Sequence, residues 1–135
     1  MYRLRGRLSF ERLRREGVRG TAGQLTVIVL PREDLGGKEP QRVIRLGVAI
    51  SRRVGKAVVR NRLRRRLRAA VQEVMCVPEA VAGGTVLPGS ADVLVAVRPG
   101  AAGASYRELR SLLAEAWDRA RGTLQATRAE GRAET

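Results

Sequence analysis

One segment of the chain limits the possible folds more than any other, because it can bury only a narrow apolar stripe. From about Lys56 to Met75 the apolar residues recur at steps of three or four, which predicts one long helix with a single buried side. Arginine occupies most of the remaining circumference, so this helix must cover a sheet or another helix along one line. The stripe consists of Val59, Leu63, Leu67, Ala70 and Val74.

Three apolar runs predict β-strands around this helix. Residues 25–30 are rich in β-branched side chains and end at a proline, and residues 43–50 alternate in the manner of a strand. Residues 92–97 form a third apolar run after the helix, typical of a buried strand. The stretches 31–41 and 76–91 contain proline and glycine and are predicted to be connections.

Two further helices complete the predicted fold. A short helix at 10–16 can be capped by Ser9, and the sequence at 105–108 is a capping box that opens a long amphipathic helix. The order helix, strand, strand, helix, strand, helix indicates an α+β protein, built as a two-layer α/β sandwich with its helices on one side of the sheet. We expect residues 1–121 to form a single domain and the polar residues 122–135 to form a disordered tail.

The charge of the chain points to a polyanionic partner. Lys and Arg number 27 against 13 Asp and Glu, which gives a formal net charge of +14. Lys38 and Lys56 are the only lysines, and the planar guanidinium of arginine binds phosphate through two parallel hydrogen bonds. Nucleic acid is therefore the first hypothesis. An anionic membrane surface and a merely arginine-rich proteome are the alternatives.

Several classes of function are disfavoured by what the sequence lacks. Cys76 is the only cysteine, so the chain cannot form an internal disulfide, which suits a reducing compartment. Because histidine is absent, there is no Ser-His or Cys-His catalytic pair and no common zinc site. No apolar run approaches the roughly 20 residues of a membrane span, and no signal-peptide core is present. We therefore expect a cytoplasmic chain without a membrane partner.

The stretch 51–68 carries the most specific signal for function. It contains nine basic residues, and no acidic residue occurs from Pro40 through Gln72. Exposed helix faces normally mix both signs of charge, and like-charge neighbours on a helix destabilise it by about 0.2–0.5 kcal/mol per pair. Phosphate binding explains such a surface better than solvation does. The start of the helix after Gly55 also favours an anion through its free amides and its dipole.

This stretch, S-R-R-V-G-K-A-V-V-R-N-R-L-R-R-R-L-R, preceded by Gly47, resembles the signature of the bacterial ribonuclease P protein family. The resemblance extends to a Phe-x-x-Leu helix after a basic N-terminus, to the strand sequence at 92–99 and to the terminal amphipathic helix. It therefore covers most of residues 1–121.

The resemblance implies a ribosomal protein S5 domain 2-like fold with a left-handed βαβ crossover around the long helix. It implies the protein subunit of ribonuclease P, which binds the catalytic RNA and the 5′ leader of precursor tRNA and assists endonucleolytic removal of that leader. The RNA, with bound magnesium (Mg), would carry the chemistry, and this chain would contribute no catalytic residue. The metal sites are unknown, and the protein is expected to be monomeric outside the complex.

The resemblance also assigns two groups of residues, carried over position by position. Contacts to the catalytic RNA would be made by Arg60, Asn61, Arg62, Arg64, Arg65, Arg66 and Arg68. The leader would be bound by Phe10, Ser51, Arg52, Arg53, Lys56 and Arg98. Two positions depart from the family pattern, since Arg14 and Ile28 stand where relatives often carry aromatic residues, so leader binding should depend more on charge.

Three other classes stay open. A structural RNA-binding protein, such as a small ribosomal protein, shares this composition and element order. A stand-alone nuclease would need carboxylates placed for metal ions or for a general base, and none occurs between residues 41 and 72. A duplex-DNA reader with a basic helix would normally show dimerising heptads, for which the final helix is too short.

Overall fold

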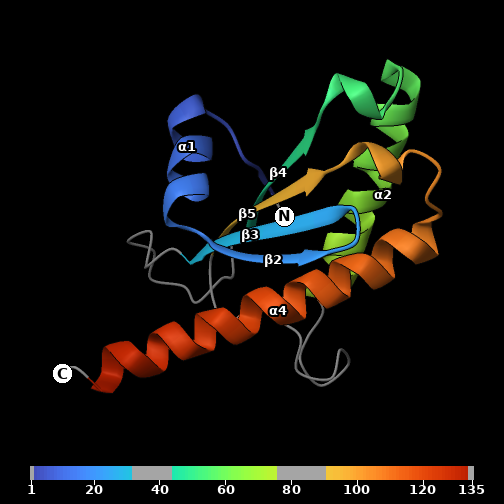
Figure 1. Cartoon of the computed structure of the whole chain (residues 1–135). Coiled ribbons are helices and arrows are strands. Elements are labelled where there is room, and N and C mark those ends of the chain that lie inside the picture. Colours follow the sequence, from blue (N-terminus) through green and yellow to red (C-terminus); the bar gives the residue numbers. More distant parts are fainter. Residues whose placement is uncertain (1, 32–43, 76–90, 134–135) are drawn as a thin grey trace.

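The computed structural model describes residues 2–31, 44–75 and 91–133. These residues form a five-stranded mixed sheet and three helices (Figure 1). The strand order is β1-β4-β5-β3-β2, which confirms the predicted α+β class. In chain order the elements are β1 (Tyr2–Arg3), α1 (Arg7–Glu16), β2 (Val18–Ala22), β3 (Leu25–Pro31), β4 (Ile44–Ile50), the 3₁₀ turn η1 (Arg52–Val54), α2 (Ala57–Met75), β5 (Ala91–Val97), the 3₁₀ turn η2 (Pro99–Ala101) and α4 (Tyr106–Ala133).

The centre of the sheet is made by β4, β5 and β3. Strands β4 and β5 are parallel neighbours joined through α2, and β5 pairs antiparallel with β3 along all seven residues of each strand. The predicted strands are confirmed. The predicted connections at 31–41 and 76–91 lie outside the described residues, except Pro31 and Ala91, which pair with each other at the ends of β3 and β5.

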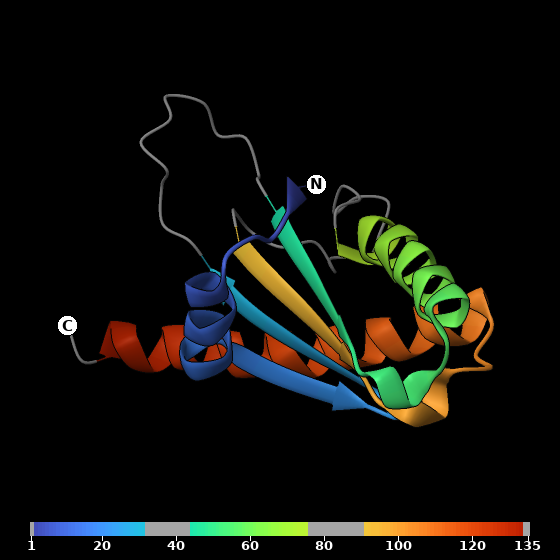
Figure 2. The same ribbon diagram turned by 90° about the horizontal axis from the view of Figure 1, so that it is seen from above.

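Helices α2 and α4 cover one face of the sheet and enclose the main core. Leu63 and Leu67 of the predicted stripe are buried there, together with Leu113 and Trp117 of α4. In Figures 1 and 2, α4 runs along the sheet while α2 lies beside β4. Leu63 and Leu67 therefore face the core, as their spacing predicts, and the arginines of α2 lie outside the core.

The prediction that all helices lie on one side of the sheet is wrong for α1. Leu13 of α1 packs with Ile28 and Leu94 on the opposite face, in a second, smaller apolar cluster. The physical reason is that β3 and β5 are apolar on both faces, as internal strands are, so both faces need cover. Figure 2 shows α1 and α2 on opposite sides of the strands.

The ends of the chain differ from the prediction as well. Two strands, β1 and β2, were not predicted, because they are short or polar. The helix predicted at 10–16 with Ser9 as its cap begins at Arg7 after Gly6, so Ser9 lies inside α1 and does not cap it. The described part of the tail predicted at 122–135 is helical: α4 continues to Ala133, and Leu124 is buried one turn after Ala120. A continued apolar step of four residues, which the polar composition concealed, extends the helix.

Two contacts fasten the start of α4 to α2. The hydroxyl of Tyr106 donates to Glu73 at 2.5 Å, and Arg110 forms an ion pair with the same carboxylate at 3.0 Å. The hydrogen bond to Glu73 raises the pKa of Tyr106 above its ordinary value. The predicted capping box is confirmed, with the amide of Glu108 donating to the Ser105 hydroxyl at 3.1 Å.

Candidate nucleic-acid interface

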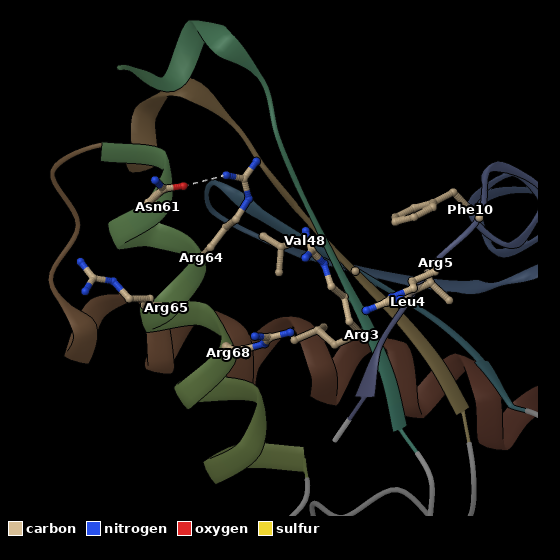
Figure 3. A pocket seen from close by; sticks show the side chains of 12 residues that line it. Arg3, Leu4, Arg5, Phe10, Val48, Asn61, Arg64, Arg65 and Arg68 are labelled. Carbon is tan, nitrogen blue, oxygen red and sulfur yellow. Dashed lines mark hydrogen bonds between the residues drawn. The ribbon is translucent and has the colours of Figure 1, made fainter. Parts of the chain in front are cut away.

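A cavity of about 630 Å³ lies between the first half of α2 and the segment that follows β1, with β4 between these two walls (Figure 3). A volume of this size accommodates a ligand comparable to one or two nucleotides. The lining is formed by Arg3, Leu4, Arg5, Gly6, Phe10, Leu46, Gly47, Val48, Asn61, Arg64, Arg65 and Arg68.

The first wall is one flank of α2. Because Leu63 and Leu67 are buried in the main core, the positions beside this line are held at the mouth of the cavity. Arg64 donates to the side-chain oxygen of Asn61 at 3.2 Å, and Arg68 follows one turn later. In Figure 3, Arg65 extends away from Arg3, whereas Arg64 and Arg68 lie nearer to β4. The wall is thus a row of guanidinium groups with one amide.

The second wall is built by the pairing of β1 with β4. Arg3 is in register with Leu46, and the amide of Leu4 donates to the carbonyl of Leu46 at 2.9 Å. The chain then turns at Gly6, whose φ of 93° is readily adopted by glycine and by few other residues, and enters α1. This turn keeps Arg3 and Arg5 beside β4, and both side chains are exposed.

Phe10 is both a core residue and a lining residue. Its ring packs on the apolar cluster around Leu13 and also lies over Gly47, where a Cβ would come within 2.6 Å of the ring. Gly47 is therefore needed for the ring to approach β4 this closely. The half-buried ring leaves part of its surface to the cavity, which is compatible with the predicted stacking role.

The cavity has no acidic residue in its lining, and the acids lie elsewhere. Among residues whose side chains the structure describes, every Asp and Glu is engaged in an ion pair or a helix cap, and none of them belongs to the lining. The ion pairs are Arg7–Glu11, Arg12–Glu16, Arg15–Glu16, Arg45–Asp92, Arg110–Glu73, Arg119–Glu115 and Arg121–Asp118. No carboxylate of the lining therefore competes with an external anion for the cations of the cavity.

The residues predicted to bind the leader are divided between two places. Phe10 lines the cavity, whereas the other five lie at the opposite end of β4 and β5, at the corner formed by η1 and η2. All five are exposed and outside the lining: Ser51, Arg52, Arg53, Lys56 and Arg98. The structure thus shows a basic cavity and a separate basic corner.

The predicted contacts of α2 are also divided. Asn61, Arg64, Arg65 and Arg68 line the cavity, while Arg60, Arg62 and Arg66 do not. Arg66 donates to the carbonyl of Ala104 at 2.9 Å, so it helps to hold the segment before α4. Nε of Arg60 is buried and has no hydrogen-bond partner in the described structure, whereas Arg62 is exposed.

The lining is poorly suited to magnesium, because Mg²⁺ binds carboxylate and water oxygens and the charged groups here are cations. Within residues 2–31, 44–75 and 91–133, no three His, Cys, Asp or Glu side chains are grouped as metal ligands. In the same part of the chain, no helix has the length and apolar character needed to cross a membrane.

Sequence reasoning missed one wall of the cavity. Arg3, Arg5 and Val48 are brought to it by the β1–β4 pairing, which joins residues far apart in the chain. The only signal for Arg3 and Arg5 was the basic character of the N-terminus, which does not reveal where those residues lie.

The chain is similar to known proteins over most of its length. The family model described as Ribonuclease P matches residues 1–121. A ribonuclease P protein component of Roseiflexus sp. strain RS-1 is 35% identical over 93% of this chain and 90% of its own length. The corresponding protein of Acidothermus cellulolyticus is 38% identical over 94% of this chain and 91% of its own length.

A solved structure shows the same fold. The ribonuclease P protein of Staphylococcus aureus superposes with a TM-score of 0.65 at 21% identity, covering 87% of this chain and 94% of that one. The family match spans most of the chain and includes both walls of the cavity. The chain therefore belongs to the ribonuclease P protein family, and it is a protein subunit of ribonuclease P.

Proposed function

We propose that this chain binds the catalytic RNA of ribonuclease P and the 5′ leader of precursor tRNA, and so assists endonucleolytic removal of the leader. The observation that carries the proposal is the acid-free cavity, in which arginines from two walls and one aromatic ring surround strand β4. Guanidinium groups bind phosphate, and an aromatic face stacks on an unpaired base, so this combination suits single-stranded RNA.

The two sides of α2 suggest a division of roles. Arg62 is exposed outside the lining, and Arg65 extends away from Arg3 in Figure 3, so both would contact the catalytic RNA. Arg60 and Asn61 would support them. Arg68 sits at the mouth of the cavity, where it can reach either RNA. In this scheme the leader passes Phe10 and reaches the corner at η1 and η2.

The chemistry would reside in the RNA partner. The lining contributes no carboxylate and no imidazole, so its residues can neutralise phosphate and position a strand but offer no general base at neutral pH. We propose that magnesium is bound mainly by the RNA and supplies the activated water. The chain's part is to hold the leader and the catalytic RNA together and to lower the repulsion between them.

The test is cleavage of precursor tRNA by a bacterial ribonuclease P RNA at low magnesium, with and without this protein. We expect the protein to restore correct 5′ cleavage. The double variant Arg65→Ala with Arg68→Ala should raise the protein concentration needed by at least about tenfold, equal to about 1.4 kcal/mol.

The control is Arg12→Ala with Arg107→Ala, which removes the same charge from exposed positions of α1 and α4. It should behave like the wild type. If the wild-type protein binds the RNA but never restores cleavage, the proposal is wrong, and a structural RNA-binding role replaces it. If both double variants lose activity equally, net charge rather than the α2 row is responsible.

A further inference from the structure

The N-terminal segment forms a basic wall for which the α2 signature gives no hint. Arg3 and Arg5 stand across the cavity from Arg64 and Arg68, and in Figure 3 Arg3 extends toward Val48. No ion pair of Arg3 or Arg5 is found in the described part of the chain, while Arg7 and Arg12 on the neighbouring helix are each paired with a glutamate. The charges at positions 3 and 5 are therefore available to a ligand, and those at 7 and 12 are largely compensated.

The strand between the two walls has an open edge. Strand β1 pairs with β4 at Arg45 and Leu46 only, and the chain then leaves the sheet at Gly6. The carbonyl of Leu46 points toward β1, where it accepts from Leu4, so the backbone of Val48, two residues on, faces the same side. In the described structure no strand pairs with Val48 on that side, and Val48 lines the cavity.

These features fit an extended, single-stranded polyanion better than a duplex. The cavity holds about 630 Å³, the size of a pocket for one or two nucleotides, and a duplex would be too wide for it. Only an unstacked base can stack on the half-buried ring of Phe10 at one end of the cavity. The donor and acceptor of the open strand edge can serve a 2′-hydroxyl or a base edge, neither of which carries charge.

We propose that Arg3 and Arg5 clamp the phosphodiester backbone of single-stranded RNA against Arg68, with the strand lying along the open edge of β4. This inference rests on the proposed function and adds to it the N-terminal wall. The phosphates belong either to the precursor leader or to an unpaired segment of the catalytic RNA, because both present the same chemistry.

The test compares two variants of equal charge in the holoenzyme assembled with a bacterial ribonuclease P RNA. One is Arg3→Gln with Arg5→Gln, and the control is Arg7→Gln with Arg12→Gln, whose side chains lie outside the lining. Affinity for precursor tRNA is measured between 50 and 200 mM salt, with a single-stranded leader and without one. Each phosphate contact to a single strand contributes about 0.7 to the slope of log K against log salt.

We expect the variant at positions 3 and 5 to lower this slope by about 1.4 and to reduce affinity at least about tenfold, with the control unchanged. If only the affinity for the substrate with a leader falls, the phosphates belong to the leader. Binding of the protein to the catalytic RNA is measured over the same salt range, and if that affinity falls instead, the phosphates belong to the catalytic RNA. Either result supports the clamp, whereas slopes equal to those of the control overturn it.

Two further measurements keep the result interpretable. Arg3→Lys with Arg5→Lys retains both charges and should recover most of the slope but less of the affinity, because lysine lacks the bidentate fork. If the glutamine variant fails to fold, this lysine variant still decides, since unchanged affinity would contradict a guanidinium clamp. If wild-type protein does not stimulate cleavage at all, the proposed function fails, and this is seen before any variant is compared.

Discussion

An alanine at Gly20 should destabilise the protein strongly, because β2 and α4 are in backbone contact there. A Cβ at this position would lie 2.0 Å from the carbonyl oxygen of Ala116 and 2.5 Å from the backbone nitrogen of Ala120. Carbon–oxygen contacts between backbones are normally about 3.3 Å or longer. Backbone atoms cannot rotate away as a side chain can, so α4 would have to move by more than about 1 Å.

The expected loss of stability follows from the residues at this contact. Ala22, Ala116 and Trp117 are fully buried, so a displaced helix loses dispersion contacts on both sides. A gap of about 0.5–1 Å forfeits roughly a quarter to a half of the attraction between two atoms, and overpacked cores lose about 1–3 kcal/mol. We expect about 3 kcal/mol, and a melting temperature lower by roughly 10 °C for a domain of this size.

The assay is urea denaturation followed by circular dichroism, with Gly122→Ala as the matched control. Gly122 is exposed in α4, and a Cβ there meets nothing within 4 Å, so helix propensity alone should stabilise the protein by about 0.5–1 kcal/mol. The two substitutions are therefore expected to act in opposite directions. If Gly20→Ala matches the wild type, the close packing of α4 on β2 is incorrect.

Two further predictions concern polar pairs. The pKa of Tyr106 is raised by its hydrogen bond to Glu73, so this contact stabilises the fold fully below pH 10.0 and is lost as the pH rises through the raised value. Absorbance at 295 nm should show a lower tyrosine midpoint in Glu73→Gln, and an unchanged midpoint would contradict the contact. Arg45→Ala removes a two-bond pair with buried Asp92, with hydrogen bonds of 2.7 and 2.9 Å, and should lower the free energy of unfolding by about 1–3 kcal/mol. Arg7→Ala, which removes an exposed pair, should change the urea midpoint little, and equal effects of the two substitutions would refute the argument.

Much of the fold could be predicted because its main elements carry strong local patterns. The stripe of Leu63 and Leu67 fixed the buried side of α2, and the capping box marked the start of α4 within one residue. The position of α1 could not be read from its own sequence, since its buried side chains fit either face of the sheet. The position of α1 depends on β3 and β5 being apolar on both faces, and this is a property of those strands and not of the α1 sequence.

For a similar reason, the sequence predicted only one of the two walls of the candidate site. The α2 wall follows from helical spacing, and Asn61, Arg64, Arg65 and Arg68 do lie together. The opposite wall depends on a two-residue strand at the N-terminus, too short to produce any periodic signal. The family resemblance assigned Arg66 to the RNA contacts, yet Arg66 donates to the carbonyl of Ala104, because the approach of α4 is decided by tertiary packing.

The open edge of β4 has a consequence for how the protein behaves without its partner. An unpaired strand edge is a template on which a second chain can add its own strand, and natural proteins guard such edges. The β2 edge is approached by α4, since Arg119 donates to the carbonyl of Thr21. The β4 edge is flanked by Arg3, Arg5 and Arg68 instead, so two copies meeting there would bring like charges together. The arginines for which we propose RNA binding thus also oppose self-association and aggregation at this edge.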